Sequence, residues 1–291
     1  MPSRGIISVD VEDYFHVQAF ADIVDRKTWL SYPSRVEPNT ERLLGLFDDF
    51  HIKATFFILG WVADLYPRLV RRIVAEGHEP ACHSYWHRPI FALTPDEFRE
   101  DTERAKDVIE QAAGVRVDGY RAPSFSITER SLWAFEVLAG LGFRYDSSIF
   151  PIPHDAYGIK NAARYPTCVK TPSGSIQEFP LATLRCKGVG NLPVAGGGYL
   201  RMLPFWYTRA GVHRLWGEGL PVVSYVHPWE LDPGQPRLNG SVRSKLRHYT
   251  GLKGAETRLR NLLSLGGFTS FRDSGYVRMP ASVVSAKAVS R

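Results

Sequence analysis

The sequence predicts an α/β domain built around a parallel sheet or a barrel. Over the first two thirds of the chain, short apolar runs alternate with amphipathic stretches, an order typical of strands joined by helices. The chain has 291 residues, of which 44% are hydrophobic and 23% charged, as expected for a globular protein with a full core. We find no internal repeat and no low-complexity segment, so we predict one barrel domain with a C-terminal extension.

Hydrophobic periodicity sets the expected order of the elements. Strands are expected at residues 5–9, 54–59, 79–83, 119–121, 143–147 and 221–227. Helices are expected at residues 41–51, 67–76, 95–113, 128–141, 206–218 and around 255–265. The clearest helix start is at Thr94, which can cap the helix, with Pro95 at its first position and Glu97 completing a capping box.

The segment from about 150 to 200 has a different character. Prolines, glycines and short alternating pieces predict loops and hairpins that cover one end of the α/β body. We therefore place the barrel at residues 1–235, with this insertion inside it. A basic extension, packed on the barrel, is predicted for residues 236–291.

The chain carries a formal net charge of +6, and much of the excess lies after Arg237. A basic C-terminal region can favour an anionic polymer, a membrane surface or nucleic acid, or it can be an ordinary solvated surface. No stretch forms a block of five or six like charges. A nucleic-acid partner would rest on net charge alone, so we predict none.

The cysteines and the N-terminal residues favour a reducing, cytoplasmic location. Cys82, Cys168 and Cys186 are too few and too scattered for a disulfide framework. The first residues hold one short apolar run before three acids, which is unlike the apolar core of a secretory signal. No window approaches the roughly 18 apolar residues of a membrane span.

Polar side chains follow several of the predicted strands, and the carboxyl ends of strands are where barrels gather their functional residues. The first cluster holds Asp10, Glu12 and Asp13, directly after an apolar run. These carboxylates would repel one another unless a cation or a proton relieved them. Strand alternation places Asp10 and Glu12 on one face and Asp13 on the other. Taken alone, the cluster is also compatible with a plain acidic loop.

A second cluster contains His83 and His87, which follow the predicted strand at 79–83. Two histidines four residues apart can point at one metal from a helical turn, although unrelated histidines also occur at this spacing. Two imidazoles plus one carboxylate would make an open site for zinc or a similar divalent ion.

Three further strand ends add polar groups. Arg121 could hold a catalytic carboxylate in place through a bidentate pair, or form an ordinary salt bridge. Asp146 could orient a histidine ring nitrogen, or cap a turn. His227 closes an apolar strand, where it could act as a general acid or pack in the core.

Together these segments resemble the five motifs of the polysaccharide deacetylases, the NodB-homology or carbohydrate esterase family 4 group. The likeness covers roughly residues 5–230 and rests on HxxxH, RAP, DSS and a strand-end histidine in the family's order. The pieces DVEDYFH, GYRAPSFSI, YDSSIFP and YVHPWELDP resemble more narrowly the subgroup that accompanies bacterial exopolysaccharide and exosortase systems, which carries a C-terminal extension.

The resemblance implies a distorted (β/α) barrel with fewer than eight regular repeats. It also implies a divalent metal, usually zinc, bound by His83, His87 and one carboxylate. Asp10 becomes the general base with Arg121 as its partner. The resemblance makes His227 the general acid, with Asp146 supporting it.

The first motif departs from the family's usual pair of adjacent aspartates. Val11 stands in the second place, so we assign Glu12 to the metal, with Asp13 as the alternative. The implied activity is removal of acetyl groups from N-acetylated amino sugars in a bacterial polysaccharide. The alternatives are an allantoinase-like amidohydrolase acting on a small cyclic amide and a catalytically silent carbohydrate-binding protein.

Aromatic residues near the strand ends are candidates for contact with sugar rings, or for packing in the core. They are Trp86, Phe125, Tyr225 and Trp229. The expected partner is an N-acetylated oligosaccharide or polysaccharide, together with peripheral association with a polysaccharide synthesis complex. The sequence leaves the polymer, the native metal and the oligomeric state open.

Overall fold

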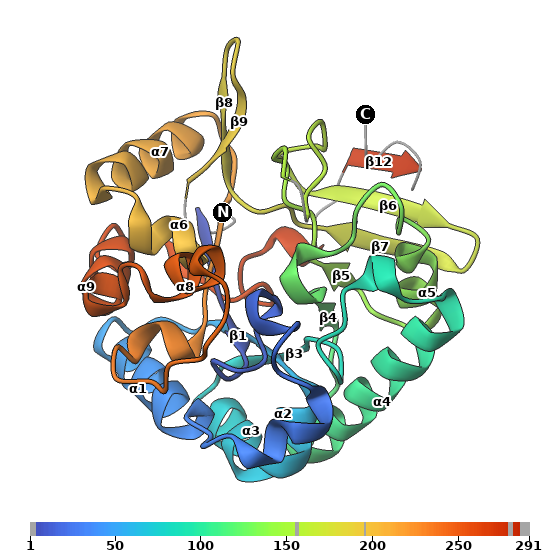
Figure 1. Ribbon diagram of the computed structural model, residues 1–291. Helices are drawn as coiled ribbons and strands as arrows, with labels where there is room; N and C mark the ends of the chain where they lie inside the picture. Colours follow the sequence, from blue (N-terminus) through green and yellow to red (C-terminus); the bar gives the residue numbers. More distant parts are fainter. Residues whose placement is uncertain (1–3, 155–156, 195, 279–281, 286–291) are drawn as a thin grey trace.

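The computed structural model describes residues 4–154, 157–194, 196–278 and 282–285 (Figure 1). In this part of the chain, ten strands form one sheet in the order β10-β1-β2-β3-β4-β5-β7-β6-β12, and β11 also pairs with β1. The six strands that carry the site are β1 (Gly5–Val11), β2 (Thr55–Ile58), β3 (Glu79–Cys82), β4 (Gly119–Tyr120), β5 (Tyr145–Asp146) and β10 (Val222–Val226). All neighbouring pairs among these six strands are parallel.

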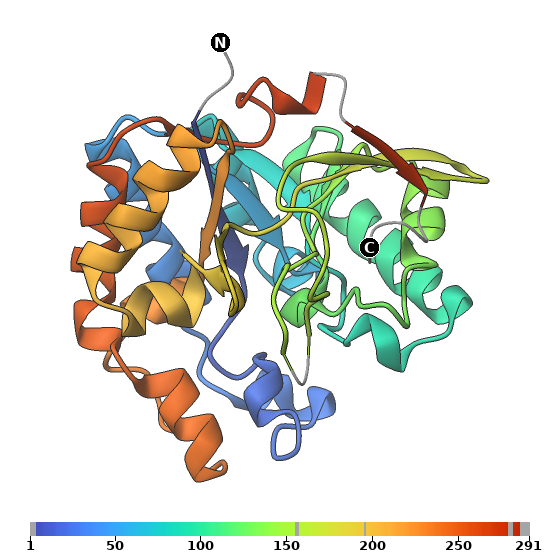
Figure 2. The same ribbon diagram turned by 90° about the horizontal axis from the view of Figure 1, so that it is seen from above.

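The parallel strands form because most of their residues are apolar and all of them are buried. The register pairs Val9 with Phe56 on one side and with Val226 on the other. As a result the carboxyl ends of β1, β2, β3 and β10 meet on one side, which is the lower side in Figure 2. The predicted fold class, a distorted barrel of alternating strands and helices, is confirmed.

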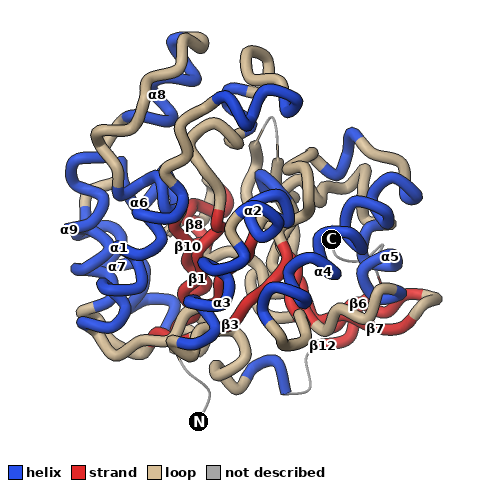
Figure 3. Tube along the Cα trace, turned by 90° about the horizontal axis from the view of Figure 1, so that it is seen from below, coloured by secondary structure: helices blue, strands red, loops and turns tan. Residues whose placement is uncertain are grey.

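Helices surround the sheet (Figures 1 and 3). The main ones are α1 (Val36–Asp49), α3 (Pro67–Ala75), α4 (Pro95–Ala113), α5 (Ala134–Gly140), α7 (Phe205–Gly217) and α9 (Leu252–Leu263). The shorter ones are α2 (Gly60–Leu65), α6 (Gly197–Met202) and α8 (Val242–Tyr249). The capping box predicted for α4 is present, because the Thr94 hydroxyl accepts from Glu97 N at 3.3 Å and Thr94 N donates to Glu97 Oε2 at 2.8 Å.

The barrel is closed by a connecting segment rather than by a continuous strand ladder. Beyond β5 the sheet continues through β7 (Gly174–Glu178), β6 (Thr167–Thr171) and β12 (Ser282–Ser285). The chain then crosses back: Phe179 N donates to Asp146 O at 2.8 Å, and Ala182 N donates to Val223 O at 3.1 Å. A hairpin of β8 (Thr183–Cys186) and β9 (Gly190–Pro193) follows.

The C-terminal part of the chain closes the amino end of the barrel. Strand β11 (Phe268–Thr269) pairs with the first residues of β1. Phe271 is fully buried and stacks on Tyr145 with ring centroids 4.9 Å apart. Glu79, at the start of β3, accepts from Arg272 N at 2.8 Å. The extension therefore completes the core of the barrel.

Several predicted boundaries differ from the structure. Helix α1 begins five residues before the predicted 41, and the helix predicted at 128–141 is limited to Ala134–Gly140. The three cysteines are free, as expected. Residues 279–281 and 286–291 of the predicted extension lie outside the described residues, and its boundary at 235 remains a prediction. None of the described helices has the length and apolar composition needed to cross a membrane.

Candidate metal centre and active site

Glu12, His83 and His87 converge at the carboxyl ends of β1 and β3. Each offers one ligand atom, and these atoms all lie within 4.8 Å of one another. The three side chains are buried, with 2–3% of their surface exposed. Glu12 Oε2 lies 2.7 Å from His87 Nε2. A buried carboxylate between two imidazoles is a donor set that suits a divalent cation.

The loop that carries the two histidines has a different geometry from the predicted one. Residues 83–87 do not form a helical turn, so that part of the prediction is wrong. Ser84 and His87 instead have φ angles of 62° and 51°, in the left-handed region. The Ser84 hydroxyl accepts from His87 N at 3.0 Å and holds this bend. The bend brings the imidazole rings to a centroid distance of 5.3 Å.

The hydrogen bonds around the group fit a metal centre. His83 Nδ1 lies 2.9 Å from the Arg121 carbonyl oxygen, so it donates there and leaves Nε2 as the free donor atom for a cation. Burial lowers the pKa of His83 to about 4, which keeps the imidazole neutral, as a ligand must be. Among the described groups, Glu12 Oε2 makes no well-aligned hydrogen bond even though His87 Nε2 lies 2.7 Å away, so both atoms are available to a cation.

The two candidate carboxylates after β1 have separate surroundings. Asp13 turns away from the histidines and accepts from Ser34 Oγ at 2.8 Å, Arg35 N at 2.7 Å and Val36 N at 3.1 Å. It thereby caps the first turn of α1. Of the two, it is Glu12 that lies with the histidines.

Asp10 is held by a fully buried arginine. Arg121 Nη1 donates to Asp10 Oδ1 at 2.7 Å and to the Ser8 hydroxyl at 2.7 Å. The other guanidinium nitrogens donate to Ser147, through Nε to its carbonyl at 3.0 Å and through Nη2 to its hydroxyl at 3.0 Å. Arg121 thus fixes one carboxylate oxygen of Asp10 and leaves Oδ2 directed toward His227, whose Nε2 lies 3.9 Å away.

His227 lies next to Asp10 and Glu12, just after β10. Its Nε2 is 3.6 Å from Glu12 Oε1, and its Nδ1 is 3.1 Å from Glu230 Oε2. Burial lowers the pKa of His227, but the carboxylates of Glu230, Glu12 and Asp10 outweigh burial and raise the pKa to about 9. The His227 side chain is 16% exposed, against 2–3% for the metal-centre residues. A protonated nitrogen is therefore available at the solvent edge of the site.

Glu230 is a site residue that sequence reasoning missed. Its second oxygen accepts from Arg201 Nε at 2.5 Å, and both side chains are buried. Burial raises the pKa of Glu230, but Arg201 and His227 lower it to about 2. Arg201 is in turn held by the carbonyls of His248 at 3.1 Å and Thr250 at 2.5 Å. The spacing of three residues between His227 and Glu230, as in a capping box, was the available signal.

Asp146 occupies a different place from the predicted one. It was expected to support His227, but the carboxylate at His227 Nδ1 is Glu230. Asp146 instead accepts from Ser148 N at 2.8 Å and from Ser148 Oγ at 2.7 Å. Ser148 Oγ also accepts from Ala122 N at 2.8 Å. Asp146 therefore orders the segment next to Arg121.

The four aromatic candidates lie around the site to different extents. Trp229 is sandwiched between the rings of His227 and His248, with centroid distances of 4.9 and 4.1 Å, and its Nε1 donates to Glu12 Oε1 at 3.2 Å. Phe125 and Tyr225 are buried and contact each other edge to face at 4.8 Å. Trp86 is half-buried. A role for these residues in binding sugar remains a prediction.

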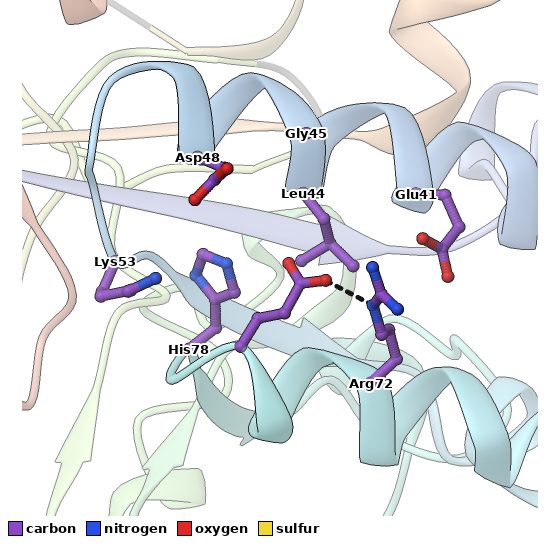
Figure 4. A pocket seen from close by; sticks show the side chains of 8 residues that line it. Glu41, Leu44, Gly45, Asp48, Lys53, Arg72 and His78 are labelled. Atoms are coloured by element: carbon purple, nitrogen blue, oxygen red, sulfur yellow. Dashed lines mark hydrogen bonds and ion pairs between the residues drawn. The ribbon is translucent and has the colours of Figure 1, made fainter.

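A separate pocket lies between α1 and α3 (Figure 4). It has a volume of about 400 Å³ and is lined by Glu41, Leu44, Gly45, Asp48, Lys53, Arg72, Glu76 and His78. Lys53 and His78 precede β2 and β3, so the pocket is at the amino end of the sheet. It is therefore distinct from the candidate active site.

Both halves of the chain match models of known protein families. The polysaccharide deacetylase family matches residues 24–145, and a domain of unknown function (DUF3473) matches residues 147–275. The peptidoglycan-N-acetylglucosamine deacetylase of Bacillus cereus is 34% identical over 98 residues, covering 33% of this chain and 36% of that protein. The matches thus span little more than a third of the curated relatives' own length.

Two solved structures share the fold. One is a Mycobacterium smegmatis protein provisionally described as a polysaccharide deacetylase, with a TM-score of 0.64, 21% identity and coverage of 98% of this chain and 95% of that chain. The other is a family 4 carbohydrate esterase from Streptomyces lividans, with a TM-score of 0.51, 17% identity and coverage of 96% and 98%.

The site draws on both matched regions. His83, His87 and Arg121 come from the region of the deacetylase match, whereas Arg201, His227 and Glu230 come from residues 147–275. The chain therefore joins a polysaccharide deacetylase domain, matched over residues 24–145, to a DUF3473 region that contributes residues to the candidate active site.

Proposed function

We propose that this protein is a metal-dependent hydrolase that removes acetyl groups from N-acetylated amino sugars of a bacterial polysaccharide. The observation that carries the proposal is the convergence of Glu12, His83 and His87 within 4.8 Å, with Asp10 and His227 beside them. The Bacillus cereus relative, named for deacetylation of N-acetylglucosamine, supports the substrate class.

Glu12, His83 and His87 would hold the divalent ion, which we take to be Zn²⁺ because two imidazoles and one carboxylate are ligands that it favours. When bound, such an ion polarises a carbonyl oxygen and lowers the pKa of water. Trp229 Nε1 and the Arg121 carbonyl keep Glu12 and His83 oriented for this task.

Asp10 would act as general base. Its Oδ1 is fixed by Arg121, so Oδ2 is the oxygen that can take the proton of the attacking water. His227 Nε2 would then donate its proton to the departing amine nitrogen, which is a poor leaving group without it. The Glu230 carboxylate lies at Nδ1 of the same imidazole and keeps the imidazole protonated. Proton transfer of this kind is typically worth about 10²–10⁴-fold in rate.

We further propose that the natural substrate is an exopolysaccharide, on the basis of the subgroup motifs, and that Trp86, Phe125 and Tyr225 contribute to the sugar-binding surface. Trp229 would act through His227 rather than by stacking on a sugar, because both faces of its indole are covered. The buried base, acid and ligand set gives no support to a catalytically silent role.

The test is release of acetate from N-acetylglucosamine oligomers by the zinc-loaded protein, with allantoin assayed in parallel. The proposal predicts acetate release, loss of at least about 10²-fold in His227→Ala, and no change in the matched control His213→Ala, whose side chain is exposed on α7. Ring opening of allantoin without acetate release would favour the amidohydrolase. Binding of the oligomers without either reaction would favour a silent binding protein.

A further inference from the structure

Four large aliphatic side chains are exposed on α8 and on the segment of residues 18–31. Two are on α8, Val242 at 75% and Leu246 at 62% exposed. The other two come much earlier in the sequence: Ile23, 47% exposed, follows the 3₁₀ helix η1 (Gln18–Phe20), and Leu30, 76% exposed, is in the 3₁₀ helix η2 (Arg26–Ser31). We call these four residues the apolar rim. Isolated exposed aliphatic residues are common on protein surfaces, whereas exposed aliphatic residues that are grouped indicate an interaction site.

The segment that carries Ile23 and Leu30 lies beside α8. Phe20, in the 3₁₀ helix η1 (Gln18–Phe20), contacts the rings of His248 and Tyr249 at the end of α8, with centroid distances of 5.1 and 6.1 Å. Val242 and Leu246 are four residues apart on the helix and share one face. Figure 2 shows both α8 and the dark blue segment that includes η1 projecting from the lower side of the molecule.

The stretch of sequence that contains α8 carries cations and no acidic residue. Between Asp232 and Glu256 the chain contains no acidic residue, whereas its cations in this stretch are Arg237, Arg243, Lys245, Arg247 and Lys253. The segment around Leu30 adds no net charge, since Asp22 and Asp25 offset Arg26 and Lys27. The rim thus combines exposed aliphatic side chains with a local excess of cations.

We propose that the apolar rim and the basic residues of α8 dock this protein on a bilayer surface that carries anionic lipids. A short helix with aliphatic residues on one face and lysine and arginine beside them is the composition that binds at such an interface. The aliphatic side chains enter the headgroup boundary and the cations remain at the anionic phosphates. An anionic polymer would use the cations but would gain nothing from Val242 and Leu246.

Docking in this orientation would have a consequence for access to the active site. Helix α8 and the segment that includes η1 project from the side on which the carboxyl ends of β1 and β10 lie, and His227 follows β10 directly. The solvent edge of the site would then face the membrane surface. A substrate held at that surface would reach His227 without a change in the orientation of the protein.

The test is flotation of the full-length protein with vesicles of phosphatidylcholine containing phosphatidylglycerol, and with vesicles of phosphatidylcholine alone. We expect binding to the anionic vesicles that falls as salt rises from about 0.05 to 0.5 M. The double variant Val242→Ser/Leu246→Ser should bind about tenfold more weakly. The matched control is Val189→Ser, which changes an exposed valine between β8 and β9 and should bind as the wild type does.

The same variants distinguish this proposal from the proposed function. None of Val242, Leu246 and Val189 belongs to the active site, so acetate release from soluble oligomers should be unchanged in all of them, and this also reports correct folding. The proposal is overturned if the wild type does not float with anionic vesicles, or if the double variant floats equally well. Strong binding of dextran sulfate that persists in the double variant, with weak vesicle binding, would assign the basic surface to an anionic polymer instead.

Discussion

The substitution Glu230→Gln isolates the group that controls the proton on His227. The Glu230 carboxylate is 3.1 Å from His227 Nδ1, and it is the strongest of the charges that raise the pKa of His227 to about 9. Glutamine keeps an acceptor of the same shape but removes the charge. We therefore expect the pKa of His227 to return toward its ordinary value of about 6.5.

The expected effect on activity depends on pH. At pH 8 a group with a pKa of about 9 is roughly 90% protonated, whereas one with a pKa of about 6.5 is roughly 3% protonated. Glu230→Gln should therefore lose up to about 30-fold in kcat/KM at pH 8 and much less at pH 6. The alkaline limb of the pH profile should move to lower pH.

The assay is acetate release by zinc-loaded protein between pH 5.5 and 9.5. Glu218→Gln is the matched control, because Glu218 pairs with Arg164 and Arg214 at the surface and lies outside the site. Glu230→Gln also leaves the buried Arg201 without its anion, and breaking a buried pair typically costs about 3–5 kcal/mol, so thermal unfolding is measured alongside. An equal loss of activity at every pH, or an unshifted alkaline limb, would refute the assigned role of Glu230.

Three further predictions concern stability and the general base. Phe271→Ala should lower the free energy of unfolding in urea by about 3–5 kcal/mol, because it leaves a cavity in the core beside Tyr145. A change below about 1 kcal/mol would mean that the C-terminal segment does not complete the barrel. The pKa of Glu230 is lowered from 4.5 to about 2 in the folded state, so its pairing with Arg201 stabilises the protein fully above pH 4.5. Roughly 3 kcal/mol of the free energy of unfolding should be lost as the pH falls toward 2. The free energy of unfolding of Glu230→Gln should fall less over the same pH range. Asp10→Asn should lower kcat by at least about 10²-fold while zinc still binds, as measured by calorimetry, and an active variant would remove Asp10 from the mechanism.

Much of the site could be predicted from the sequence because strand ends are marked by a change from apolar to polar residues. Asp10, His83 and His227 each follow such a run, and parallel strands bring their carboxyl ends together. The sequence pattern could not predict the backbone conformation of the loop that carries His83 and His87. The left-handed conformations of Ser84 and His87 arise from contacts in the folded loop, so a helical turn was the wrong local geometry.

The sequence pattern also missed contacts between residues that are far apart along the chain. Asp13 caps α1 from more than twenty residues away, which is why the helix begins at Val36 and not at the predicted 41. Arg201 reaches Glu230 from α6, a short helix with no periodic signal of its own. These contacts depend on tertiary packing, and no local spacing in the sequence encodes them.

The central claim is that Glu12, His83 and His87 bind one divalent cation. Calorimetric titration of metal-free protein with Zn²⁺ tests it most directly, with His87→Ala as the variant and His213→Ala as the control. We predict one ion bound per chain in the wild type and the control, and loss of that binding in His87→Ala. Equal zinc binding by wild type and His87→Ala, or no binding by either, would contradict the account.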